Sequence, residues 1–154
     1  MATGTVALLG LLLAFLLGSS GTSAEARNSE RFHPWQRVLS GNWTNDLNST
    51  MQINDINEAG VFSGMYLTAV STTSQDIRLS PLQGIQQLRN QLLFGFTVNW
   101  TFSASTTVFV GQYLVRADGR ELLKTTWLLR AAVKSMKDDW RATRVGTNTF
   151  HRTN

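Results

Sequence analysis

The sequence has no cysteine among its 154 residues, so disulfide bonds, cysteine-ligated zinc and thiol catalysis are excluded. Histidine is scarce as well, with only His33 and His151. These two provide neither an HExxH zinc motif nor a clear catalytic triad, and no GxSxG motif or glycine-rich phosphate loop is present. The chain must be stabilised by its core, by closure of a sheet or by assembly, and we expect no metal site.

Charge is missing from the first 24 residues, which contain an apolar run from Val6 to Leu17 followed by small residues. This run is too short to span a bilayer, and the small residues up to Ala24 are typical of a signal-peptide cleavage site. We therefore expect a secretory signal at residues 1–24, a polar leader with little fixed structure at residues 25–38, and an extracellular, secreted protein. Residues 39–152 would then form one domain.

Charge is also sparse overall, at 16% of the residues with a net charge of +4. The basic residues between Arg116 and Arg144 are spaced out and interrupted by Glu121, Asp138 and Asp139. This spacing predicts a solvated basic face rather than a groove for phosphates. We expect neither a nucleic acid nor a membrane as a partner.

From Leu39 onwards, short alternating segments predict an all-β chain of about eight strands. Ser135–Trp140 does not alternate and predicts a loop with one helical turn. The Asp118-Gly119 pair suits a type I′ hairpin. Sequential strands with short connections favour an up-and-down barrel or a sandwich. The expected turns are Ser40-Gly41, Asn57–Gly60, Ser80-Pro81, Ser103–Ser105 and Asp118-Gly119.

Strand parity sorts the side chains into two faces, because successive residues of a strand point to opposite sides of a sheet. Several of the expected inward sets mix aromatic residues with hydroxyls and an amide. Such a mixture either lines a lumen for a partly polar ligand or places hydroxyls that bond their own backbone. The sets are Asn45, Leu47 and Ser49; Tyr66, Thr68 and Val70; Phe94, Phe96, Val98, Trp100 and Phe102; Thr107, Phe109 and Gly111; and Thr125, Trp127 and Leu129.

Few residues suggest catalysis. Asp46 is the one carboxylate that interrupts a region otherwise rich in inward polar residues, and a single carboxylate cannot form a glycosidase pair. Trp140 lies in a polar loop, where a tryptophan favours a contact with a partner. These features favour a binding protein over an enzyme.

Three N-glycosylation sequons, at Asn42, Asn48 and Asn99, fit an exported chain. Parity places Asn48 and Asn99 on the outward face. We therefore expect a glycoprotein.

Five stretches resemble the avidin family: GNWTNDL (41–47), GMYLTAV (64–70), FGFTVNW (94–100), LKTTWLLR (123–130) and DDWRATRVG (138–146). The resemblance is collinear from about Leu39 to Arg152. It implies an eight-stranded antiparallel up-and-down β-barrel that binds biotin at one end. It further implies a homotetramer without enzymatic activity and without a cofactor, biotin being the ligand.

The resemblance also assigns roles residue by residue. The ureido oxygen of biotin would accept hydrogen bonds from Asn45, Ser49 and Tyr66, and its N–H groups would donate to Thr68 and Asn148. Thr107 would contact the sulfur, and Trp140 would cap the site of a neighbouring subunit. The apolar wall would comprise Leu47, Val70, Trp100, Phe102, Phe109, Trp127 and Leu129. The carboxylate would meet Ser71, Thr72, Thr73, Ser103 and Ser105.

The chain departs from the family pattern at several positions. Tyr113 stands where the family has one of two paired cysteines, and Thr72 stands where it has an alanine. Thr126 and Thr147 replace apolar residues that lie between subunits, which affects the expected strength of assembly. A secreted lectin-like or interaction module with an altered ligand is the alternative reading.

Overall fold

The computed structural model describes residues 38–88 and 92–153, which belong to one compact unit spanning Phe32–Asn154. The expected signal peptide, His33 and all of the expected leader except Val38 lie outside the described residues. No helix within the described ranges is long and apolar enough to cross a membrane.

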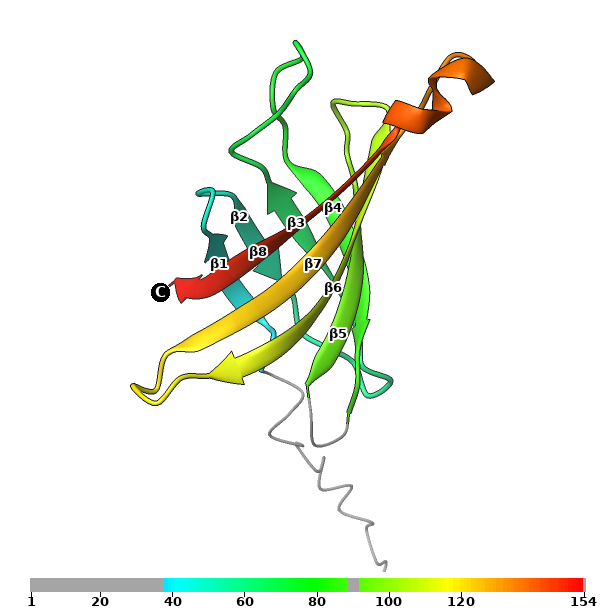
Figure 1. Cartoon of the computed structure of the whole chain (residues 1–154). Coiled ribbons are helices and arrows are strands. Elements are labelled where there is room, and N and C mark those ends of the chain that lie inside the picture. The colour runs from blue at the N-terminus through cyan, green and yellow to red at the C-terminus, as the bar shows by residue number, and fades with distance from the viewer. Residues whose placement is uncertain (1–37, 89–91, 154) are drawn as a thin grey trace, which may run out of the picture. The chain divides into compact units, whose positions relative to one another are not determined.

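Eight antiparallel strands form a closed barrel in the order β1-β2-β3-β4-β5-β6-β7-β8 (Figure 1). The predicted eight-stranded up-and-down barrel is confirmed. A short 3-10 helix, η2, precedes the last strand at Met136–Arg141, where one helical turn was expected. The strands are β1 (Gly41–Asn45), β2 (Thr50–Ile53), β3 (Val61–Leu67), β4 (Ser80–Gln86), β5 (Leu93–Asn99), β6 (Ser105–Val115), β7 (Glu121–Ala131) and β8 (Thr143–Thr153).

Three hairpins share one loop geometry, at Asn45–Ser49, Asn57–Val61 and Arg116–Arg120. In each, the fourth residue donates its N–H to the carbonyl of the first and has a positive φ: 64° at Asn48, 81° at Gly60 and 81° at Gly119. This is a type I turn followed by a left-handed residue. The expected type I′ turn is therefore wrong, because Asp118 keeps a negative φ.

The expected turn at Ser80-Pro81 is also wrong, since these residues begin β4. Pro81 pairs with Met65 of β3, but the pairing of β4 with β5 starts only at Leu82. The missing N–H of Pro81 therefore lies beyond the β5 ladder, where a proline is tolerated.

An aromatic stack fills the middle of the barrel. The rings of Phe96 and Phe109 are stacked with centroids 4.6 Å apart, and Tyr66 stacks on Phe109 at 5.7 Å. Phe94 and Val98 are buried beside them, as parity predicted for this strand. Tyr66 and Phe109 of this stack also line the cavity at one end of the barrel, so the stack forms the floor of that cavity.

Arg152 secures one end of the barrel. Its guanidinium lies 4.2 Å from the centroid of the buried Trp43 ring and donates to the Ser40 carbonyl at 2.8 Å. It also pairs with Glu121, which accepts a hydrogen bond from Tyr113 at 2.6 Å. Burial alone would raise the pKa of Glu121, but the bonds from Arg152 and Tyr113 bring it below its ordinary value. Tyr113 thus supports this ion pair.

Close packing at Gly84 gives a test of the barrel. A Cβ there would meet the Gly95 carbonyl oxygen at 2.4 Å and Phe62 Cζ at 2.5 Å. We expect Gly84→Ala to lower the free energy of unfolding by ~1–3 kcal/mol, measured by denaturant titration. Gly95→Ala is the control, because its Cβ would approach the Phe109 carbonyl oxygen only to 3.4 Å. Equal stability of the two variants would contradict the packing.

Candidate functional site

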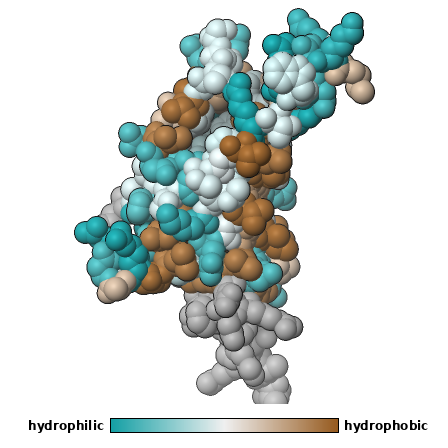
Figure 2. All heavy atoms as spheres, in the orientation of Figure 1, coloured by the Kyte–Doolittle hydropathy of each residue, from teal (hydrophilic) through white to brown (hydrophobic). Residues whose placement is uncertain are grey.

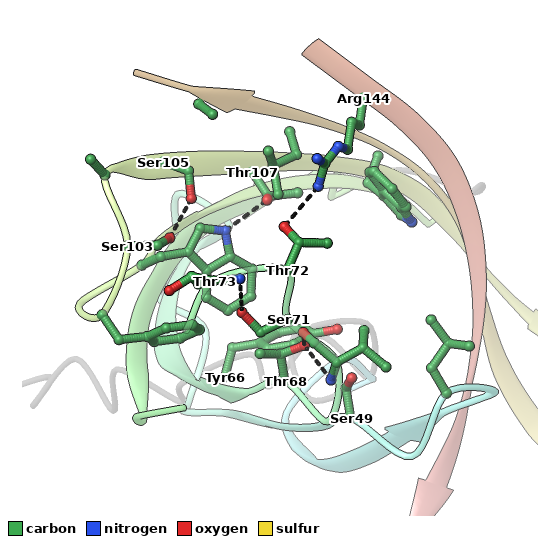
Figure 3. Close-up of a pocket in the computed structure, with 18 of the residues that line it drawn as sticks. Ser49, Tyr66, Thr68, Ser71, Thr72, Thr73, Ser103, Ser105, Thr107 and Arg144 are labelled. Atoms are coloured by element: carbon green, nitrogen blue, oxygen red, sulfur yellow. Dashed lines mark hydrogen bonds between the residues drawn. The ribbon is translucent and has the colours of Figure 1, made fainter. Parts of the chain in front are cut away.

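A cavity of about 510 Å³ opens at the end of the barrel where alternate connections gather. In an up-and-down barrel, the β1–β2, β3–β4, β5–β6 and β7–β8 connections lie at the same end, as Figure 1 shows. Each of these regions contributes lining residues. Residues separated by up to about a hundred positions in the sequence therefore meet around one cavity (Figure 3).

Every residue that the resemblance placed around a ligand within one subunit lines this cavity. The deep positions are buried, among them Asn45, Ser49 and Thr107. Leu47 and Val70 lie at the mouth and are 46% and 52% exposed. The structure thus brings together the whole expected set except Trp140.

The apolar wall contains Trp100, Phe102, Phe109, Trp127 and Leu129. Trp100 donates its indole N–H to Thr107 Oγ1 at 2.8 Å and meets the Tyr66 ring edge to face at 5.4 Å. Both contacts fix the orientation of the indole. Trp127 lies against β8 because Gly146 has no side chain, and a Cβ there would come within 2.4 Å of the indole.

Three donors converge at the deep end of the cavity. The Asn45 Oδ1 accepts from the N–H groups of Leu47 and Ser49, both at 2.9 Å, so its amide nitrogen faces Tyr66. The Ser49 Oγ accepts from the Ala69 N–H at 3.0 Å, and its hydroxyl hydrogen, which bonds to Tyr66 in the free protein, can turn to an acceptor on a ligand. Asn45, Ser49 and Tyr66 therefore offer donors to one acceptor.

Tyr66 is held in its protonated form. Burial is the main cause that raises its pKa to about 12, and the Asp46 charge adds to it against the opposing bond from Ser49. Its oxygen accepts from the Asn45 amide at 3.2 Å, so its own hydrogen is available. The phenol is consequently a donor throughout the neutral pH range.

Two acceptors stand beside these donors. The Thr68 hydroxyl donates to the Val70 carbonyl at 2.8 Å, so its oxygen offers only lone pairs to a ligand. The Asn148 amide nitrogen donates to Asp46 at 2.7 Å, which turns its carbonyl oxygen away from Asp46. The deep end therefore complements a small group with one carbonyl oxygen flanked by N–H groups.

Hydroxyl groups surround the outer part of the cavity. The hydroxyl oxygens of Ser103 and Ser105 are hydrogen-bonded at 2.5 Å, and Ser71 Oγ accepts from the Thr73 N–H at 3.1 Å (Figure 3). Thr72 accepts from an Arg144 guanidinium nitrogen at 2.9 Å. This rim offers donors and a positive charge, which suits an anionic group.

Two arginines of the rim, Arg141 and Arg144, were not expected there. The spacing of the basic residues predicts a solvated face, and these two arginines in addition line the cavity. The sequence could have indicated this position for Arg144. It lies four residues before Asn148, so the two side chains share one face of the strand. The side chains of both arginines are exposed to solvent, which agrees with the predicted solvated face.

Trp140 lies on η2 and is 84% exposed, outside the cavity of its own chain. Ser135 caps η2 by accepting from the Lys137 N–H at 3.1 Å. Arg130 pairs with Asp139, and Arg141 with Asp138. A large apolar side chain is thus presented to solvent on an anchored segment.

The model of the avidin family matches residues 34–153. The chain belongs to the avidin family. It is 50% identical to avidin from Gallus gallus over 148 residues, which cover 94% of this chain and 91% of avidin. It is 56% identical to avidin-related protein 2 from Gallus gallus over 115 residues, which cover 74% of this chain and 77% of that protein.

Solved structures agree with this assignment. A biotin binding protein from chicken superposes with a TM-score of 0.74 at 52% identity, covering 77% of this chain and 99% of that protein. Xenavidin superposes with a TM-score of 0.73 at 47% identity, covering 75% of this chain and 97% of Xenavidin. Within residues 38–88 and 92–153, no group of three or more His, Asp or Glu side chains is placed to hold a metal ion.

The two tyrosines of the chain give a test by titration. Burial is the main cause that raises the pKa of both Tyr66 and Tyr113 to about 12, with the Tyr113 bond to Glu121 adding to it. In the unfolded chain both phenols should ionise near pH 10, so the folded state loses stability as the pH rises from 10 through 12. We expect tyrosinate absorbance of the folded protein to rise near pH 12. A step near pH 10 in folded protein would contradict the described burial.

Proposed function

We propose that this protein is a secreted, non-enzymatic protein that binds biotin, with one site per subunit of a homotetramer. The observation that carries the proposal is the pattern of three donors and two acceptors at the deep end of the cavity. Biotin presents a cyclic urea, whose oxygen accepts and whose two N–H groups donate. The proteins similar to this chain include a biotin binding protein from chicken, which supports biotin as the ligand.

The ureido group would lie at the deep end. Its oxygen would accept from Asn45, Ser49 and Tyr66, and its N–H groups would donate to Thr68 and Asn148. These protein groups are already oriented by their own hydrogen bonds, so little ordering is left to occur on binding. Hydrogen bonds in a cavity shielded from water are also stronger than in solution.

The bicyclic ring would lie among Trp100, Phe102, Phe109 and Trp127, with the sulfur against Thr107. Aromatic walls remove the ring from water, which contributes to the affinity. The carboxylate would lie at the hydroxyl-rich rim with Ser71, Thr72, Thr73, Ser103 and Ser105. Arg144 adds a positive charge there that the resemblance had not assigned.

Biotin titration followed by tryptophan fluorescence tests the proposal. We expect a change in emission that saturates at one biotin per chain, because two tryptophans line the cavity. Tyr66→Phe should weaken binding by about tenfold or more, since it removes one of the three donors to the ureido oxygen. The matched control is Tyr113→Phe, which removes a phenol outside the cavity. No fluorescence change with micromolar biotin would refute the proposed ligand.

The homotetramer is supported by an outward apolar face on β6, β7 and β8. Val108 and Leu128 are 41% exposed and paired in register, and Leu128 pairs in turn with Val145, which is 65% exposed. Figure 2 shows hydrophobic residues along this side of the barrel. Thr126 and Thr147 interrupt the face, and we expect them to weaken the assembly relative to an all-apolar face.

Trp140 tests the shared site. If it caps the cavity of a neighbouring subunit, Trp140→Ala should speed biotin release by about tenfold or more while the fold is kept. Met136→Ala is the control, because Met136 is 90% exposed on the same short helix. The mass in solution is measured alongside. An unchanged release rate in a wild-type tetramer would contradict a capping role.

Secretion and glycosylation belong to the same proposal. The signal peptide assigned to residues 1–24 would direct export, and the cysteine-free barrel requires no oxidising compartment for its stability. Asn42, Asn48 and Asn99 are all exposed in the folded chain, so glycans could be accommodated at each of them. Asn48 lies on the β1–β2 hairpin, next to the cavity residues Leu47 and Ser49.

A further inference from the structure

The Arg144 side chain is bonded across the rim of the cavity to the β3–β4 connection. One of its guanidinium nitrogens donates to Thr72 Oγ1 at 2.9 Å (Figure 3). In the barrel, β8 is a neighbour of β7 and β1, and β1 and β2 separate it from β3. The bond therefore joins two parts of the rim that no ladder of the sheet connects directly, and both residues line the cavity.

The Thr72 hydroxyl is directed differently from the hydroxyls on either side of it. Ser71 Oγ accepts from the Thr73 N–H at 3.1 Å, and Thr73 Oγ1 accepts from the Gln75 N–H at 2.8 Å. These two hydroxyls shape the connection itself, as Ser and Thr often do in turns. The Thr72 hydroxyl between them instead accepts from β8. Alanine, which the family has at this position, could not make that bond.

The positive charge of Arg144 is not neutralised by a carboxylate. Within the parts of the chain that the structure describes, no ion pair includes Arg144. Arg141, the other arginine of the rim, is paired with Asp138. A hydroxyl accepts a hydrogen bond without carrying a charge. Thr72 therefore orients the Arg144 guanidinium and leaves its charge and its other N–H groups for a ligand.

We propose that Thr72 is a positioning residue that aims Arg144 at the acidic end of the ligand, and that this pair makes the site selective for a free carboxylate over its neutral derivatives. The inference rests on the proposed function, because the ligand is taken to be biotin with its carboxylate at the rim. A guanidinium presents paired N–H groups that match the two oxygens of a carboxylate. A carboxamide offers only one neutral oxygen as an acceptor.

Thr72→Val tests the role, because valine keeps the shape of the side chain and lacks the hydroxyl. The ligands are biotin and its primary amide, which differ only at the carboxylate. Wild-type protein should bind biotin more tightly than the amide. In Thr72→Val, we expect the ratio of the two dissociation constants to shrink by about fivefold, because the charged donor is no longer held at the rim. Thr72→Ser restores the hydroxyl and should keep the wild-type ratio.

A second threonine that accepts from an arginine gives the matched control. Thr143 Oγ1 accepts from an Arg130 guanidinium nitrogen at 3.2 Å, and Thr143 does not line the cavity. Thr143→Val should leave the ratio unchanged. A salt series adds a readout of charge, because Thr72 and Arg144 are both exposed to solvent. The wild-type preference for biotin should fall as ionic strength rises, and the fall should be smaller in Thr72→Val.

A further measurement needs no ligand. In the free protein, NMR relaxation of Arg144 Nε should report a side chain that is ordered on the nanosecond timescale. Thr72→Val should make this side chain more mobile, and Thr143→Val should not. This readout follows the position of the guanidinium and does not depend on which ligand the cavity takes.

The outcomes separate this inference from the proposed function. A selective loss for biotin in Thr72→Val that Thr72→Ser restores supports the inference. An equal loss for biotin and the amide overturns it, and so does an unchanged ratio, unchanged Arg144 mobility or a wild-type protein that binds both ligands equally well. If wild-type protein binds neither ligand while Thr72→Val still releases Arg144, the proposed ligand is wrong and the positioning of Arg144 stands.

Discussion

Pairing of β1 with β8 closes the sheet, and the cavity depends on that closure. Asn45 pairs with Phe150 across the junction, which brings the first hairpin beside Asn148 near the other end of the chain. Without this ladder, β1 and β8 would each expose an unpaired edge. Closure stabilises a chain that has no cysteine, and Arg152 strengthens the junction by contacting Trp43 and pairing with Glu121.

The site is organised before any ligand arrives. Asn45 is oriented by the main chain of its own hairpin, Thr68 by the main chain that follows it, and Asn148 by Asp46. Each polar side chain therefore has a fixed donor or acceptor role in a cavity with aromatic walls. Because these polar groups already have partners, their burial costs less stability than that of unpaired polar groups.

Relations between neighbours in the chain were predictable from the sequence. Parity correctly separated Phe94, Phe96 and Val98 from the exposed Thr97 and Asn99, because the period of two is a property of every strand. Turn details were less accessible. Asp118-Gly119 forms a different turn from the one expected, and Ser80-Pro81 begins a strand, since the partner strands decide which proline or glycine geometry is tolerated.

The sequence by itself determined the all-β pattern, the inward faces and, through its resemblance to the avidin family, the residues of the cavity. Only the tertiary structure decided how those residues are directed. The bond between Asp46 and Asn148 joins positions 102 residues apart, and the contact of Arg144 with Thr72 joins positions 72 residues apart. No local pattern encodes such contacts, because they depend on which strands become neighbours when the barrel closes.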